Sequence, residues 1–203
     1  MGTKALILAL ALALAVPAAA HAQNAPPRAP AQQNAAPRAP APPLPVQVET
    51  LFQQLSDAAD ANQAARVEVS LLRVLAQSGS PTADLLLVRG TEAMNKGDHE
   101  TALNTFNSLV KLSPNFAEGW NRRATLYFIM GKLEASIADC QKTLQLEPRH
   151  FGALVGLGQI YVILNRRDDA KRALQRALAA HPHLAGAKQL LEAVDKMDGG
   201  REI

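Results

Sequence analysis

Cysteine and aromatic residues are scarce in this chain of 203 residues, and neither positive nor negative charge is in large excess. The single cysteine, Cys140, cannot form an intramolecular disulfide bond, which excludes a small domain held together by disulfides. The formal net charge is only +3 and the basic residues are dispersed, so neither a nucleic-acid-binding stripe nor a polybasic membrane patch is present. The sequence therefore predicts no nucleic acid among the partners.

Catalytic and metal-binding motifs are also missing. No G-x-S-x-G, P-loop or dinucleotide-binding fingerprint occurs, and no metal-ligating residue stands at an i, i+4 spacing from the histidines considered. We interpret His99, His150, His181 and His183 as solvated loop residues. The prediction is a protein that is not an enzyme, with no catalytic residue, no metal site, no cofactor and no evident small-molecule substrate.

What the chain does contain is a period of 34 residues. The blocks Ala83–Phe116, Ala117–His150 and Phe151–Leu184 align end to end without insertions. Small residues share one column of this alignment and prolines share another: Gly90, Ala124 and Gly158, then Pro114, Pro148 and Pro182. A fixed period of this kind is typical of stacked helical hairpins, in which each hairpin buries its apolar face against its neighbours.

The residues within each block resemble the tetratricopeptide repeat (TPR) family, whose pattern is W-x2-L-G-x2-Y followed by Ala, a large apolar residue, Ala and Pro. The third block fits it best, with Leu154, Leu157, Gly158, Tyr161, Ala170, Leu174, Ala177 and Pro182 at those places. Arg89 and Arg123 depart from the pattern, because Leu is usual there. The resemblance implies an all-α fold, a right-handed α-α superhelix (TPR solenoid) of three clear repeats.

The same register continues upstream in a degenerate form. Residues 46–79 have the apolar spacing of two helices, and we interpret them as a degenerate hairpin that caps the N-terminal end of the array. Residues 185–197 are expected to form an amphipathic C-terminal capping helix, followed by a tail at 198–203. Proline and alanine dominate residues 23–45, which we predict to be a disordered linker.

The N-terminus has the features of a cleavable signal peptide over residues 1–22. Lys4 precedes an apolar run at 5–16, and the tripeptide A-H-A at 20–22 matches a cleavage site. The run is shorter than the roughly 20 apolar residues of a membrane span, which disfavours an uncleaved anchor. No cysteine follows the run, so a lipoprotein is not expected. The sequence predicts a periplasmic or secreted protein with no integral membrane segment after cleavage.

The TPR resemblance also implies where a partner binds, because in such arrays the first helix of each hairpin lines a concave groove. The candidate partner-binding residues are Leu87, Thr91, Met94, Asn121, Arg122, Thr125, Phe128 and Gln159. Some family members clamp an acidic peptide tail with two Lys, two Asn and an Arg. Those places hold Leu87, Thr91, Arg122, Gly152 and Gly156 here, so this class of partner is not expected.

Three functional interpretations remain open at this level. The favoured one is a non-catalytic scaffold or adaptor, exported to the bacterial cell envelope, that binds a peptide or a partner protein in the groove. The alternative is an enzyme, or an accessory subunit of an envelope enzyme or assembly complex that serves secretion, cytochrome maturation or cell-wall metabolism. A repeat array whose purpose is dimerisation is the third.

Overall fold

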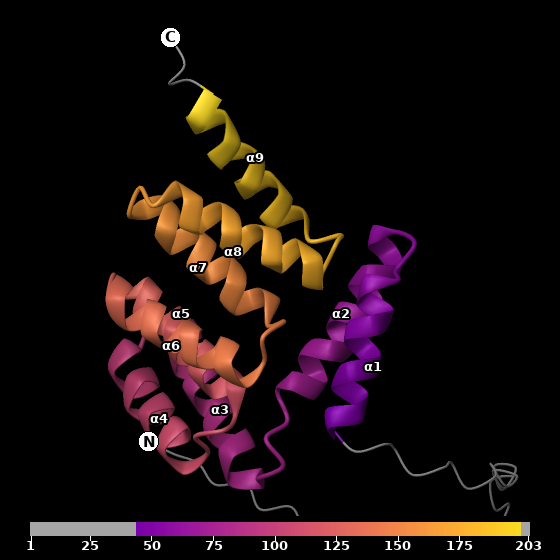
Figure 1. The fold of residues 1–203 in the computed structure, drawn as a ribbon. Helices are drawn as coiled ribbons and strands as arrows, with labels where there is room; N and C mark the ends of the chain where they lie inside the picture. The colour runs from indigo at the N-terminus through magenta and orange to yellow at the C-terminus, as the bar shows by residue number, and fades with distance from the viewer. Residues whose placement is uncertain (1–43, 200–203) are drawn as a thin grey trace, which may run out of the picture. The chain divides into compact units, whose positions relative to one another are not determined.

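The computed structural model describes residues 44–199, and within this range it contains helices and no strands (Figure 1). The expected signal peptide, almost all of the expected linker and the last residues of the tail lie outside the described residues. No helix in the described part is both long and apolar enough to cross a bilayer.

Three helical hairpins form the array, one for each 34-residue block. Within each pair the two helices pack closely along their length, and successive pairs contact each other. The pairs are α3 (Pro81–Asn95) with α4 (His99–Leu112), α5 (Ala117–Ile129) with α6 (Leu133–Leu146), and α7 (Phe151–Ile163) with α8 (Arg167–Ala180). The predicted all-α solenoid is confirmed (Figure 1).

The turn inside each hairpin is made by a residue with a left-handed backbone. Gly97 and Gly131 have φ values of 76° and 70°, and Asn165 has a φ of 54°. Glycine and asparagine tolerate this conformation, so these residues end the first helix of each pair. Asp98 then begins α4, because its side chain accepts a hydrogen bond from the backbone N–H of Thr101 at 3.1 Å.

The close crossing of the two helices explains the column of small residues. A Cβ atom added at Gly90 would collide with the ring of Phe106, and one added at Gly158 would lie 2.8 Å from the side chain of Leu174. Phe106 and Leu174 are both fully buried. The large side chain of the second helix therefore occupies the space that the glycine of the first helix leaves open.

The N-terminal hairpin does not sit where the sequence register suggested. It consists of α1 (Leu44–Ser56) and α2 (Ala61–Leu75), and it packs against the third repeat rather than stacking on the first (Figure 1). Its buried residues share one core cluster with residues from α7, α8 and α9: Phe52, Leu55, Ala58, Ala64 and Leu71 with Phe151, Leu154, Leu174, Ala177 and Ala187.

The outer face of the first repeat explains this difference. Leu126 of the second repeat belongs to the core cluster of the first repeat, so this position of a repeat faces the preceding hairpin. The equivalent residue of the third repeat, Ile160, is fully buried as well. In the first repeat the same column holds Glu92, which is charged and exposed. A polar outer face ends a solenoid, so no hairpin is expected to stack ahead of α3.

Polar contacts add to the apolar interface that holds the hairpin. The guanidinium of Arg149, in the turn before α7, donates to both carboxylate oxygens of Glu49 on α1, at 3.1 and 2.9 Å. The same guanidinium lies 4.3 Å from the ring centroid of Phe52. After α8, His183 donates from Nε2 to the backbone carbonyl of Ala58 at 2.9 Å. The hairpin thus contacts the turns on both sides of the third repeat.

The last helix, α9 (Ala185–Gly199), packs on α8 and more lightly on α7. Ala187 and Val194 are fully buried on one side of it, whereas Lys188 and Lys196 are exposed. This separation of apolar and charged residues is the amphipathic pattern expected for a helix at the end of an array.

Candidate functional site

The first helices α3, α5 and α7 carry the predicted partner-binding residues, and the three repeats present them differently. On α3, Leu87 is only 6% exposed and packs in the core of the first repeat, so it is not available to a partner. Met94 is half-buried against the same core, and the hydroxyl of Thr91 donates to the backbone carbonyl of Leu87 at 2.8 Å. The contribution of α3 to the candidate site is therefore small.

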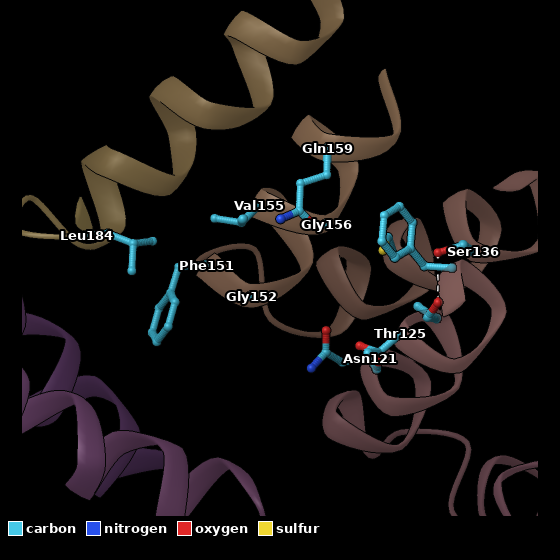
Figure 2. A pocket seen from close by; sticks show the side chains of 12 residues that line it. Asn121, Thr125, Ser136, Phe151, Gly152, Val155, Gly156, Gln159 and Leu184 are labelled. Atoms are coloured by element: carbon cyan, nitrogen blue, oxygen red, sulfur yellow. Dashed lines mark hydrogen bonds between the residues drawn. The ribbon is translucent and has the colours of Figure 1, made fainter. Parts of the chain in front are cut away.

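The candidate residues of α5 and α7 surround a hollow instead. Asn121, Thr125 and Phe128 line it from α5, and Gln159 lines it from α7 (Figure 2). Its volume is about 270 Å³. The other lining residues are mostly small or apolar: Ala124, Ser136, Cys140, Phe151, Gly152, Val155, Gly156 and Leu184. The structure thus brings four of the eight predicted residues together around one hollow.

Two glycines of α7 line the hollow, and Gly156 leaves space open, whereas a Cβ atom added at Gly152 would lie 3.3 Å from the His150 ring. Gly152 and Gly156 lie one helical turn apart on the side of α7 that faces the hollow (Figure 2). In the second repeat the corresponding positions hold Glu118 and Arg122, two long side chains. Cys140 and Val155 also line the hollow, and a Cβ atom added at Gly156 would lie 3.6 Å from the Sγ atom of Cys140.

Cys140 belongs to the floor of the hollow and is not a nucleophile. Its side chain is buried, and this burial raises the pKa of its thiol to about 12, with the nearby carboxylate of Asp139 acting in the same direction. A thiol with so high a pKa is protonated at neutral pH and therefore unreactive. The residue takes the column of the buried Phe106 and Leu174, as expected for a small apolar residue.

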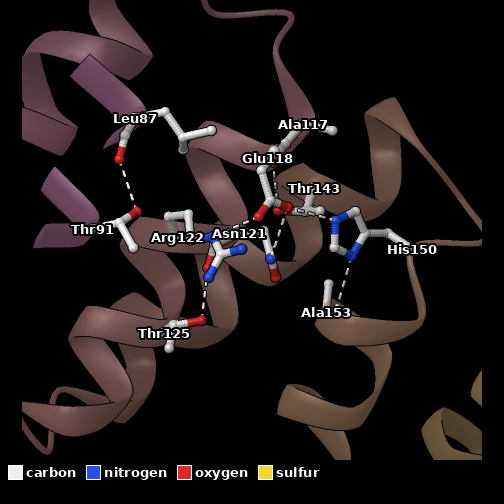
Figure 3. A network of polar contacts seen from close by, with 10 residues as sticks. All are labelled: Leu87, Thr91, Ala117, Glu118, Asn121, Arg122, Thr125, Thr143, His150 and Ala153. Atoms are coloured by element: carbon white, nitrogen blue, oxygen red, sulfur yellow. Dashed lines mark hydrogen bonds and ion pairs between the residues drawn. The ribbon is translucent and has the colours of Figure 1, made fainter. Parts of the chain in front are cut away.

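A buried polar network stands beside the hollow, at the start of α5 and α7 (Figure 3). Its centre is the carboxylate of Glu118, which is only 3% exposed. Glu118 accepts hydrogen bonds from Asn121 Nδ2 at 3.0 Å, from Arg122 Nε at 2.5 Å and from His150 Nε2 at 3.0 Å. Three donors around one buried carboxylate compensate for its removal from water.

The tautomer of His150 follows from its second contact. The backbone N–H of Ala153 can only donate, and it points to Nδ1 of His150 at 3.2 Å. Nδ1 must therefore carry a lone pair, and Nε2 carries the proton that is donated to Glu118. His150 begins α7 as its N-cap residue. The interpretation of this histidine as a solvated loop residue is wrong, since its side chain is 2% exposed.

The ionisation of Glu118 reflects two opposing effects. Burial alone would raise the pKa of its carboxyl group, but the hydrogen bond from His150 and the positive charge of Arg122 act against burial. The net result is a pKa below the usual value, so Glu118 is ionised at neutral pH. Arg122 and Asn121 are therefore partly engaged within the protein, and the carboxylate neutralises the Arg122 charge.

Sequence reasoning missed the roles of Glu118, His150 and His181. His181 is also buried, at 2% exposure, and its Nε2 atom contacts the carboxylate of Glu68 on α2 at 3.2 Å. The partners of both histidines are distant along the chain, so no local spacing could reveal them. In the described part of the chain no group of three or more potential ligands could hold a metal ion.

Fold and site together define a helical-repeat protein with an open hollow on the face made by its first helices. Family models of the tetratricopeptide repeat match residues 117–150 and residues 83–116 and 151–183. A TPR repeat-containing protein of Rhizobium etli is 32% identical over 156 residues, which cover 76% of each chain. The chain belongs to the tetratricopeptide repeat family.

Solved structures agree on the fold. The first TPR domain of Spaghetti (RPAP3), bound to the HSP90 peptide SRMEEVD, matches with a TM-score of 0.57 at 21% identity, over 59% of this chain and 95% of that one. MamA matches with a TM-score of 0.56 at 21% identity, over 74% of this chain and 86% of that one. TPR domains bind peptides and partner proteins, and this chain has the architecture of such an interaction domain.

Proposed function

We propose that this protein is a non-catalytic adaptor of the bacterial cell envelope, and that it binds a segment of a partner protein in the hollow between α5 and α7. The observation that carries the proposal is the hollow itself, about 270 Å³ of open space on the face formed by the first helices. Thr125 and Gln159 are exposed at its rim, and Phe128 and Val155 supply apolar surface. An apolar hollow with a few polar groups is what a peptide site requires.

The neutrality of the hollow narrows the class of partner. None of its lining residues carries a formal charge, and Arg122 beside it is paired with Glu118. A solvated acidic tail would gain little from this surface, because its carboxylates would lose water without meeting a free cation. The partner segment is therefore expected to be apolar where it enters the hollow.

Export is the second element of the proposal. It is supported by the short basic start, the apolar run at 5–16 and the A-H-A cleavage site at 20–22. The test is the mass of the protein recovered from fractionated bacteria that express the full chain. A product that begins at Gln23 in the periplasm or the medium supports export. Intact chain confined to the cytoplasm contradicts it.

The binding function is tested by cross-linking in cells. A photoreactive residue replaces Thr125 in the full chain, and the same residue replaces Gln175, an exposed position on α8 that does not line the hollow, as the control. Mass spectrometry should identify a partner that is joined at position 125 and absent at position 175. Equal products at both positions, or none at position 125, would count against binding in the hollow.

A further inference from the structure

Two glycines of α7, Gly156 and Gly158, differ in what packs against them. Gly158 is required by packing, because a Cβ atom there would lie 2.8 Å from the side chain of Leu174. Gly156, two residues earlier on the same helix, has no such constraint. A Cβ atom at Gly156 would meet only the Sγ atom of Cys140, at 3.6 Å, which is an ordinary van der Waals contact. Packing therefore explains Gly158 and does not explain Gly156.

Neither helix geometry nor the repeat register explains Gly156. Glycine is less favourable than every residue but proline in a helix interior. The equivalent positions of the other two repeats carry Val88 and Arg122, so a large side chain is compatible with this place in the fold. A left-handed backbone is not involved either, since Gly156 is absent from the glycines with positive φ. What Gly156 provides is the empty space of the hollow.

The walls of that space determine what can fill it. Phe128 and Val155 present apolar surface, and none of the residues lining the hollow is charged. The Ser136 hydroxyl is already used, because it donates to the backbone carbonyl of Ala124 at 2.8 Å. An uncharged apolar side chain would enter without desolvating a charge, whereas a carboxylate or ammonium group would lose its water without compensation.

Two primary amides at the hollow distinguish an extended partner from a helical one. Asn121 uses one N–H of its amide for Glu118, which leaves the other N–H and the carbonyl oxygen for a ligand. Gln159 is exposed on α7, so the oxygen and the N–H groups of its side-chain amide are open to solvent. Side-chain amides both donate and accept, as an extended backbone requires, whereas the backbone groups of a helix are already paired.

We propose that the hollow at Gly156 is an anchor pocket that receives one bulky, uncharged apolar side chain from an extended segment of the partner protein. This inference rests on the proposed function and adds the chemistry of the bound segment. The size is suitable, because a cavity of about 150 Å³ in another protein accepts benzene, and the hollow here measures about 270 Å³. An aromatic ring or a branched aliphatic side chain has room to enter.

The test is a selection of random peptides displayed on phage against the immobilised mature protein. The peptides that are recovered are then measured against two variants. Gly156→Leu fills the pocket, in a column where Val88 and Arg122 show that a side chain larger than glycine is tolerated. Gly186→Leu makes the same change on α9, where nothing lies within 4 Å of the added Cβ atom. Circular dichroism and thermal melting establish that both variants are folded.

The expected result is a set of peptides that share one large apolar position. Their affinity should fall at least about tenfold on Gly156→Leu, the effect of losing one buried apolar side chain, and should not change on Gly186→Leu. Peptides that bind Gly156→Leu and the unmodified protein equally would overturn the anchor pocket and leave groove binding intact. Selected peptides that share acidic positions instead of an apolar one would also overturn it. Failure to recover any peptide would overturn the pocket, and only a negative Thr125 cross-link would remove the proposed function as well.

Discussion

Arg123 on α5 and Asp139 on α6 form a two-pronged ion pair across the second hairpin. Nε of Arg123 lies 2.7 Å from one carboxylate oxygen of Asp139, and Nη2 lies 2.9 Å from the other. The guanidinium also lies 4.9 Å from the ring centroid of Trp120 and 5.6 Å from that of Tyr127. The arginine that departs from the family pattern therefore joins the two helices of its own repeat, with its charge compensated by a buried carboxylate.

The first prediction concerns this pair. Arg123→Leu restores the usual residue of the family but leaves the carboxylate of Asp139, which is 5% exposed, without a cation. We expect a loss of about 3 kcal/mol in the free energy of unfolding, since breaking a buried pair leaves an uncompensated charge. The double variant Arg123→Leu with Asp139→Leu should lose less stability than the sum of the losses of the two single variants. Urea denaturation of all four proteins in a double-mutant cycle measures the coupling, and a coupling near zero would contradict the pairing.

The second prediction concerns pH. Because the folded protein holds the pKa of Glu118 below its unfolded value, the unfolded state binds more protons between the two values, and stability rises with pH there. The contribution of Glu118 is therefore complete above about pH 4.3, the ordinary pKa of glutamate, and is lost as the pH falls through the folded value. Glu118→Gln should flatten this part of the stability profile measured by urea denaturation. The control Glu92→Gln makes the same chemical change at an exposed carboxylate of α3, outside the network, and its profile is measured beside that of Glu118→Gln. An unchanged slope in Glu118→Gln would contradict the network.

The third prediction compares Gly156 and Gly158 on α7. Gly158→Ala should destabilise the protein by about 1–3 kcal/mol, because the new Cβ atom is forced against Leu174. Gly156→Ala should instead stabilise it by up to about 1 kcal/mol, because alanine is the better helix former and the added atom fits. The two substitutions change the same helix by the same atoms, so each is the control for the other. Equal losses in thermal or urea denaturation would show that packing fixes both glycines.

The fourth prediction tests the position of the N-terminal hairpin. Phe52 is 3% exposed in the core shared with α7 and α8, so Phe52→Ala should cost about 3 kcal/mol. Hydrogen exchange should then speed up in α1, α2 and the third repeat. Val69→Ala, at an exposed position on α2, is the control and should change little. Loss of protection in α3 and α4 instead would indicate that the hairpin stacks on the first repeat.

Much of this fold can be predicted from the sequence because the same packing positions recur in each repeat. The residue that must be small at Gly90 and Gly158 is opposed by a large one at Phe106 and Leu174, and the alignment exposes both columns. The position of the N-terminal hairpin was predicted wrongly from the same register. The sequence does indicate the correct position, because Glu92 stands 34 residues before the buried Leu126. A charged residue at this place makes the first repeat an end of the array.

The candidate site could be predicted only in part. Periodicity places Thr125, Phe128 and Gln159 on the first helices, and the structure brings them to one hollow. Periodicity does not show that Leu87 is buried, because burial depends on how tightly a particular repeat packs. Nor does it join His150 to Glu118, since the contact depends on the stacking of two repeats and on side-chain rotamers. The sequence pattern therefore predicts the helices of each repeat but not the side-chain contacts between repeats.

The most direct test of binding between α5 and α7 is an NMR titration of the isotope-labelled protein with the partner segment recovered by the Thr125 cross-link. Chemical-shift changes should concentrate on the hollow, at Thr125, Phe128 and Gly156, and should be reduced in Gly156→Leu. Changes concentrated on the exposed surfaces of α6 and α8, with the hollow unaffected, would contradict the claim that the partner binds between α5 and α7.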